Sequence, residues 1–385
     1  MHVAIRDWAD ASPPTADYVL FWGLACPPPD LTPIANLPGD VWHAGLTLGT
    51  GGLPAALDRV APTWPLHAAP DPTRPATSWR VSARACLVRA EALAVARPSG
   101  FETRTGEALA QGMAWLRAGL ITRHVPDLLP PGIAFPPEEP PSRRDELRFV
   151  ELFFGRRWRI YAGWRPAQHS PPAPPRTAPL PAAPLPAAPA ESVVIPTLDR
   201  YPYLRRALDD LAAQTRPPDE VIVVDQSTHR EPLEHAGLPL RVLPQAEPGQ
   251  CTARNAGIAA AHGAVILFVD DDDTLPPGLI AAHLALIHKA DATCGAVTEV
   301  GAPPPPRREG IAAYFPANNG MVRADVLRAV GGFDPAFDHG IRADADLGMR
   351  LYRAGALLLH APEAHLIHHR APSGGLRHYG QRRIT

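Results

Sequence analysis

A run of four aspartates, Asp270 to Asp273, is the feature of this sequence best suited to do chemistry. Adjacent carboxylates repel one another, and their ionisation is costly unless a cation neutralises them. Hard divalent ions such as Mg²⁺ and Mn²⁺ prefer oxygen ligands and often bridge to phosphates. The aspartate run is therefore best explained as a site for a metal ion bound to a diphosphate. The alternative is a solvated acidic loop, which the position of the run directly after the apolar residues 264–269 makes less favourable.

The segments around this run alternate between strand-like and helix-like patterns. Continuous apolar stretches predict buried strands, and leucines spaced three or four apart predict a helix. The expected strands are residues 192–195, 220–224 and 264–269, and the expected helices are 203–213 and 253–262. This alternation predicts a parallel α/β sheet, in which ligands bind at the carboxyl ends of the strands. Because Asp199, Asp225 and the aspartate run each follow a strand, we expect them to gather at one edge.

Residues 191–385 resemble glycosyltransferase family 2. The segments that carry the resemblance are VVIPTLDR, DEVIVVDQS, ARNAGIAAAHGAVILFVDDDDTLPPGLI and NNGMVRADVLRAVGGFDPAF. The resemblance implies a GT-A-type α/β domain, with a nucleotide-binding, mostly parallel sheet flanked by helices. It also implies transfer of a sugar from a nucleoside-diphosphate sugar to an acceptor hydroxyl, with inversion. The acceptor class, whether a glycan, a lipid-linked molecule or a small molecule, is not implied.

The resemblance assigns roles to individual positions. Asp344 takes the position of the catalytic base. Asp270 and Asp272 take the metal-binding Asp-x-Asp motif and His368 the position of a histidine near the metal, so Mg²⁺ or Mn²⁺ is the implied cofactor. The implied nucleotide-sugar-binding residues are Pro196, Thr197, Asp199, Asp225, Arg254, Asn255 and Asp271. Gly374, Gly375 and Arg377 would form a lid over the diphosphate.

Two departures from the family pattern leave alternatives open. Gln226 follows Asp225 where the family usually has a second acid, and Ala343 replaces a glutamate that usually precedes the base. The alternative function is therefore a nucleotide-sugar- or carbohydrate-binding pseudoenzyme. The alternative role for Asp344 is a plain helix N-cap, and His368 could serve packing alone.

A segment rich in proline and alanine, residues 170–190, predicts an extended linker between residues 1–169 and 191–385. The N-terminal part matches the C-terminal part in three collinear blocks, which predicts a degenerate, non-catalytic partial copy. The matched blocks are 17–31 with 264–279, 78–93 with 314–327, and 106–120 with 342–356. In this alignment Trp22 to Ala25 replace the aspartate run and Ala108 replaces Asp344. The nucleotide-binding half is expected to be absent from the copy.

Composition argues against nucleic acid as a partner and indicates the compartment of the protein. A net charge of −2 gives no basic field for nucleic acid. Four scattered cysteines and the lack of a long apolar run favour the cytoplasm. Residues 143–165 mix arginines with large aromatic residues in one helical stretch. Such a helix either packs on its own domain, which we favour, or lies on an anionic membrane, where it would meet a lipid-linked acceptor.

Overall fold

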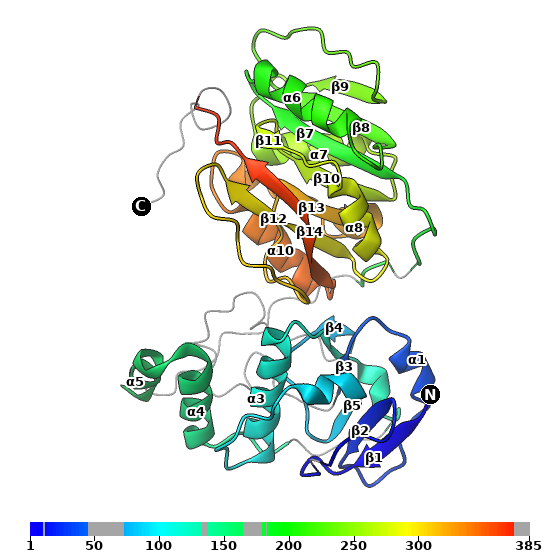
Figure 1. Ribbon diagram of the computed structural model, residues 1–385, viewed down its shortest axis with the longest axis vertical. Coiled ribbons are helices and arrows are strands. Elements are labelled where there is room, and N and C mark those ends of the chain that lie inside the picture. The colour runs from blue at the N-terminus through cyan, green and yellow to red at the C-terminus, as the bar shows by residue number, and fades with distance from the viewer. Residues whose placement is uncertain (11, 45–72, 133–137, 165–178, 182, 373–385) are drawn as a thin grey trace. The chain divides into compact units, whose positions relative to one another are not determined.

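The computed structural model describes residues 1–10, 12–44, 73–132, 138–164, 179–181 and 183–372 (Figure 1). The chain divides into two compact units, Met1–Thr177 and Ala178–Thr385. The point of division falls within the proline- and alanine-rich segment 170–190, part of which lies outside the described residues. Each unit contains a sheet of its own.

The second unit is built on an eight-stranded sheet in the order β11-β14-β12-β13-β10-β7-β8-β9. Strands β9, β8, β7 and β10 are parallel neighbours, and β12 is parallel to β14, whereas β13 runs antiparallel to β10 and β12. The expected mostly parallel sheet is thus confirmed. The strands are β7 (Glu191–Thr197), β8 (Glu220–Asp225), β9 (Leu240–Pro244), β10 (Val265–Val269), β11 (Asp273–Thr274), β12 (Ala292–Glu299), β13 (Asn319–Arg323) and β14 (Leu358–His368).

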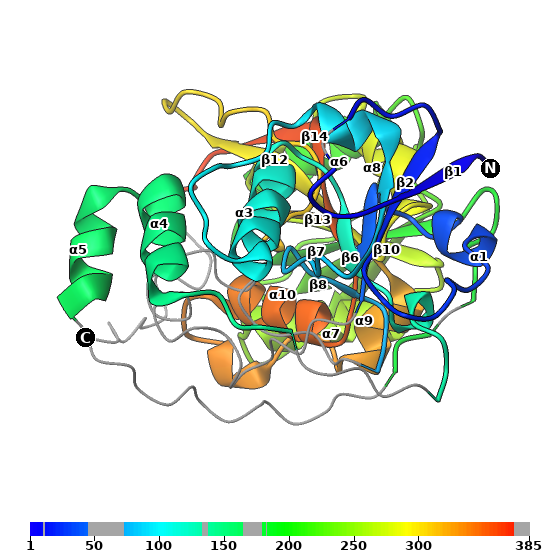
Figure 2. The same ribbon diagram turned by 90° about the horizontal axis from the view of Figure 1, so that it is seen from below.

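Helices cover both faces of this sheet, as Figure 2 shows from a second direction. One face carries α6 (Tyr201–Ala212) and α8 (Leu279–Ile287), and the other carries α7 (Gln250–Ala260), α9 (Ala324–Ala329) and α10 (Ala343–Arg353). Side chains alternate along each strand, so Val194 packs in one core and Val193 and Ile195 in the other. Burial on both faces explains why the central strands are continuously apolar.

The expected helices are confirmed with small shifts at their ends. Helix α6 begins at Tyr201, before the expected start, because Pro202 lies in its first turn, where a missing backbone N–H costs nothing. Helix α7 begins at Gln250 and lies close to β7. A Cβ atom at Gly257 would be 2.4 Å from Cγ1 of Val194, so this close approach requires glycine.

The first unit contains a six-stranded sheet in the order β1-β2-β5-β3-β6-β4. The strands are β1 (Val3–Arg6), β2 (Tyr18–Trp22), β3 (Val41–His43), β4 (Ala76–Thr77), β5 (Ala85–Arg89) and β6 (Thr122–His124). The helices are α1 (Thr32–Ala35), α3 (Arg104–Arg117), α4 (Arg143–Phe154) and α5 (Arg156–Trp164), with short 3₁₀ turns at Ala90–Ala94 and Pro126–Leu128. Its core is rich in tryptophan, with Trp8, Trp42 and Trp115 fully buried.

The strand pairings of the first sheet follow those of half the second sheet. Strands β1, β2, β5, β3 and β6 pair in the same order and directions as β7, β10, β13, β12 and β14. The registers also correspond, since Tyr18 lies opposite Arg89 as Val265 lies opposite Arg323. This register corrects the sequence alignment by one residue, because Trp22 then matches Val269 and residues 23–26 match the aspartate run. Neither alignment puts a carboxylate there.

Residues 143–164 form two helices where the sequence suggested one helix over residues 143–165. Gly155, with a φ of 95°, ends α4 and separates it from α5. Helix α4 packs on its own unit through Phe149 and Val150, as favoured, but α5 buries only Ala162. Among the described residues, no helix has the length and hydropathy needed to cross a membrane.

Candidate active site

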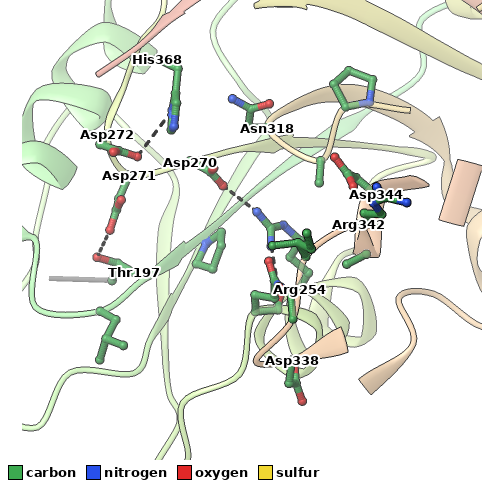
Figure 3. Close-up of a pocket in the computed structure, with 18 of the residues that line it drawn as sticks. Thr197, Arg254, Asp270, Asp271, Asp272, Asn318, Asp338, Arg342, Asp344 and His368 are labelled. Carbon is green, nitrogen blue, oxygen red and sulfur yellow. Dashed lines mark hydrogen bonds and ion pairs between the residues drawn. The ribbon is translucent and has the colours of Figure 1, made fainter. Parts of the chain in front are cut away.

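A cavity of about 590 Å³ lies at the carboxyl ends of β7 and β10 in the second unit. Its walls come from segments far apart in the sequence: the turn after β7, the aspartate run after β10, the first turns of α7 and α10, and the end of β14. Figure 3 shows Asp271, Asp272 and His368 on one side of the cavity and Asp344 with Arg342 on the other, with Asp270 and Arg254 between them. The aspartate run therefore lies at the edge expected from the strand pattern.

Asp270, Asp272 and His368 form a cluster that fits a divalent metal ion. One ligand atom from each residue lies within 4.8 Å of the others. Oδ1 of Asp272 is buried and has no hydrogen-bond partner among the described residues, as expected of an oxygen held ready for a cation. Nδ1 of His368 is 2.9 Å from Oδ1 of Asp273. Metal-binding histidines commonly have such a carboxylate partner, which orients the ring.

The backbone brings these ligands together. Strand β10 ends at Val269, and the chain turns so that the Asp270 N–H donates to Oδ2 of Asp273 at 2.9 Å. The short strand β11 then pairs with β14, placing Asp273 opposite His368. The N–H of Ala371 donates to Oδ2 of Asp272 at 2.6 Å. The histidine, almost 100 residues away in sequence, is thus fixed beside the aspartates.

Arg200 offsets part of the buried negative charge. Its guanidinium lies 3.2 Å from Asp271 and 3.4 Å from Asp272. The Thr197 hydroxyl donates to the other oxygen of Asp271 at 2.8 Å. Burial nevertheless raises the pKa of Asp271 to about 7, and it also raises the pKa of Asp273. Burial lowers the pKa of His368, but the bond to Asp273 and the nearby carboxylates outweigh it, so the net shift is upward.

Arg254 brings a second cation to the cavity from helix α7. It donates to Oδ1 of Asp270 at 2.6 Å, and its guanidinium lies 5.6 Å from the centre of the Phe333 ring. The side chain is buried, and its Nε has no hydrogen-bond partner among the described residues. Arg254 lines the cavity, and a guanidinium in such a place suits a phosphate group.

Asp344 lies across the cavity from the metal cluster. It stands in the first turn of α10, whose N-cap is Arg342, a residue in the left-handed region with a φ of 76°. The plain N-cap role is therefore wrong for Asp344, which among the described residues accepts a hydrogen bond only from the adjacent Ala345 N–H, at 2.8 Å. Burial raises its pKa. A carboxylate with a raised pKa, facing a cavity, suits a general base. Asp346, by contrast, pairs with Arg350 at 2.8 Å.

Of the remaining sequence-predicted residues, Pro196 and Thr197 line the cavity, but Asp199, Asp225 and Asn255 do not. Asp199 is exposed on the turn after β7. Asp225 is buried, and it accepts hydrogen bonds from the Tyr201 hydroxyl at 2.6 Å and the Ser227 N–H at 2.9 Å. Both ends of the Asn255 amide are bonded to the backbone of Phe333. Asp225 and Asn255 thus hold the walls of the site in place. Gly374, Gly375 and Arg377 lie outside the described residues.

The sequence did not reveal Asp338, which joins the two sides of the site. Helix α7 has no side-chain cap of its own, and its N-cap is Gly249. Oδ1 of Asp338 accepts from the Cys251 and Thr252 N–H groups at 2.7 and 2.8 Å. A Cβ atom at Gly249 would lie 2.7 Å from the Asp338 carboxyl, so glycine is required for this approach. No local pattern could show a cap supplied from 87 residues away.

Comparison with known proteins assigns the second unit to a family. Residues 192–346 match the model of glycosyl transferase family 2, so this chain carries a domain of that family. The match includes the aspartate run and Asp344.

Among curated proteins, the uncharacterized glycosyltransferase YwdF of Bacillus subtilis is 36% identical over 104 residues, covering 26% of this chain and 39% of YwdF. The uncharacterized glycosyltransferase alr2836 of Nostoc sp. is 30% identical over 176 residues, covering 37% of this chain and 54% of the relative. A pre-mycofactocin glycosyltransferase of Mycobacterium tuberculosis is 29% identical over 208 residues, covering 46% and 42%. The chain therefore spans about half or less of the length of these relatives.

Similar solved structures include Staphylococcus aureus TarS 1-349 in complex with UDP-GlcNAc, with a TM-score of 0.42 and 20% identity, covering 49% of this chain and 60% of that one. The mannosyltransferase PcManGT of Pyrobaculum calidifontis, in complex with GDP-Man and Mn²⁺, has a TM-score of 0.38 and 19% identity, covering 52% and 63%.

Proposed function

We propose that the second unit transfers a sugar from a nucleoside-diphosphate sugar to an acceptor hydroxyl, with inversion at the anomeric carbon. The observation that carries the proposal is the arrangement around one cavity, in which a metal-binding cluster faces a carboxylate within a glycosyl transferase family 2 domain. The curated relatives named above are glycosyltransferases by name, which supports the same activity.

The donor occupies the side of the cavity formed by β7 and β10. Pro196 and Thr197 contact the nucleotide, and the Arg254 guanidinium pairs with the diphosphate. Asp270, Asp272 and His368 would hold Mg²⁺ or Mn²⁺, and the ion would supply positive charge to offset that of the leaving diphosphate. Asp271 does not reach the nucleotide in this scheme, because Thr197 and Arg200 occupy its carboxylate.

Asp344 activates the acceptor. Its carboxylate takes the proton of the acceptor hydroxyl while the hydroxyl oxygen forms a bond to the anomeric carbon. The bond between that carbon and the donor's phosphate oxygen breaks, and the nucleoside diphosphate departs. Attack from the Asp344 side, opposite the diphosphate side, gives inversion.

The first unit is proposed to be a partial copy that does no chemistry. The shared strand order and register support this origin. Residues 23–26 and Ala108, which match the aspartate run and Asp344, carry no carboxylate to hold a metal or take a proton.

Helix α5 is proposed to contact an anionic membrane surface. Its exposed side chains combine the large apolar Trp158, Ile160, Tyr161 and Trp164 with the exposed Arg156 and Arg157. Aromatic residues suit the interfacial region of a bilayer, and arginines are attracted to anionic headgroups. Such contact would bring the enzyme to a lipid-linked acceptor.

The test is hydrolysis and binding of a panel of nucleotide sugars by the full chain, with and without Mn²⁺. We expect metal-dependent turnover of one donor, binding lost in Asp272→Ala, and turnover alone lost in Asp344→Asn. Binding without metal dependence or turnover would favour the pseudoenzyme. Failure to bind any nucleotide sugar would refute the proposal.

A further inference from the structure

A second cavity, of about 550 Å³, adjoins the first within the same unit. Val297, Tyr314 and Pro316 line both cavities, so the two are continuous across these residues. The second cavity, which we call the β14 groove, lies between β12, β14 and the loop of residues 304–308. None of the residues assigned to donor, metal or base lines it.

The groove exists because strand β14 is interrupted. Gly295 pairs with Ala361, but the next residue, Ala296, pairs with His365, so three residues of β14 bulge out of the ladder. Pro362 lies in this bulge and has no N–H to donate, which favours a break in pairing at that point. Pro362 and Glu363 then form part of the groove wall.

A buried polar network fixes the bulge. The Asn319 amide donates to the carbonyl oxygens of Ala296 and Ala364 at 2.9 and 2.8 Å, joining the two strands where their own bonds are missing. His283 in turn lies 3.0 Å from the Asn319 oxygen and 2.8 Å from the Thr293 hydroxyl. Burial lowers the pKa of His283 to about 4, so this histidine is neutral. A fully bonded network of this kind gives the groove a fixed shape.

The lining combines flat apolar surfaces with hydroxyl-binding groups. Tyr314 is 47% exposed, although its neighbour Phe315 is fully buried and packs edge-on against Phe268. Its ring therefore stands at the junction of the two cavities on an anchored backbone, and Pro304, Pro305 and Pro306 form the facing wall. Aromatic and proline rings of this kind can stack against the C–H face of a sugar ring.

Polar groups stand around these surfaces. Burial and the nearby Arg308 lower the pKa of His360 to about 4, so its neutral ring both donates and accepts hydrogen bonds. Nε2 of His365 lies 2.6 Å from the Thr298 hydroxyl. Arg308 is exposed at the rim, and no hydrogen bond or ion pair holds its guanidinium among the described residues. Polar groups on several sides do not suit a lipid tail, but they suit a ring bearing several hydroxyls.

We infer that the β14 groove binds the second sugar ring of an acceptor whose first ring lies beside Asp344. The acceptor is then a chain of at least two rings. This inference rests on the proposed function, because only transfer at Asp344 makes the groove an acceptor subsite.

The test measures binding of the full chain to immobilised glycans of one to six sugar units. Ala296→Leu fills the groove from β12, and Arg308→Ala removes a donor from its exposed rim, where loss of folding is not a concern. Arg206→Ala, an exposed arginine on α6, is the matched control. Donor hydrolysis in water is measured for each variant in parallel.

We expect glycans of two or more units to bind at least about tenfold more tightly than the corresponding single sugars, a difference of about 1.4 kcal/mol. Both groove variants should lose most of that difference, while Arg206→Ala keeps it and all variants retain donor hydrolysis. Any of three results would overturn the inference. Single sugars and chains could bind equally, both groove variants could bind as the unaltered protein does, or a protein that hydrolyses its donor could bind no glycan. Absence of donor hydrolysis in the unaltered protein would instead count against the proposed function.

Discussion

Replacing Asp338 by alanine should destabilise the second unit, because this one carboxylate caps helix α7 from another part of the chain. Its Oδ1 accepts from two backbone N–H groups, of Cys251 and Thr252, and its Oδ2 accepts from the Thr252 hydroxyl. Cys251 is fully buried, so the first N–H would lose its partner without full access to water. Loss of a cap costs about 1–2 kcal/mol, and loss of a negative charge at a helix N-terminus adds about 0.3–1 kcal/mol. We therefore expect the free energy of unfolding to fall by about 1–3 kcal/mol.

The chain offers an internal control for this measurement. All eight tryptophans lie in residues 1–164, so tryptophan fluorescence follows unfolding of the first unit alone. Far-ultraviolet circular dichroism follows both units. In Asp338→Ala the dichroism transition of the second unit should move down by about 5–10 °C, while the fluorescence transition stays in place.

Asp338→Asn is the matched variant, since it keeps one acceptor oxygen and the shape of the side chain. It should lose less than half as much stability as Asp338→Ala. If the second unit of Asp338→Ala melts at the same temperature as that of the unaltered protein, the carboxylate does not cap α7. Asp338 would then not join the two sides of the site. If the fluorescence transition moves equally, the effect is not confined to the second unit.

Further predictions test the site and its surroundings. Asp344→Asn should lower kcat for sugar transfer by about 10²–10⁴-fold with little change in the donor KM, whereas Asp346→Asn should lose only its surface ion pair with Arg350. Burial raises the pKa of Asp344, so this base should become protonated at a pH above the range of an ordinary aspartate. In a kcat-pH profile of the unaltered protein, kcat should therefore begin to fall above that range as the pH is lowered. Mn²⁺ should raise the melting temperature of the unaltered protein but not of Asp272→Ala, as measured by calorimetry. Burial and the neighbouring Asp219 raise the pKa of Glu191 to about 8, so the folded state keeps a proton that the unfolded state releases above about pH 4.5. The free energy of unfolding should therefore fall as the pH rises from 4.5 to 8. Glu191→Gln should flatten this dependence when unfolding is measured in urea. The full chain should sediment with vesicles containing anionic lipid but not with neutral ones, and Trp158→Ser with Trp164→Ser should abolish this, while equal sedimentation with both kinds of vesicle would argue against the charge-based contact.

The sequence alone predicted the elements whose signal is local. The apolar runs before Thr197, Asp225 and Asp270 indicated strands buried on both faces, and their alternation with helices predicted a mostly parallel sheet. Because parallel strands end at a common edge, the aspartate run was expected there, and it lines the cavity together with Asp344 and His368. Likewise, the short matched blocks pointed to the half-sheet whose pairing order recurs in the first unit.

Tertiary structure decided which polar side chains face the cavity. Asp225 and Asn255 have residue types suited to binding, but Tyr201, Ser227 and Phe333 occupy their hydrogen-bonding atoms. Asp338 caps a helix that begins 88 residues before it, and Asp273 holds His368 across a strand pairing of even longer range in sequence. A hydrogen bond is formed between atoms that the fold brings within about 3 Å, and the sequence fixes a residue's chemistry without fixing its neighbours. Which carboxylates are free for a ligand therefore depends on partners that only the folded chain supplies.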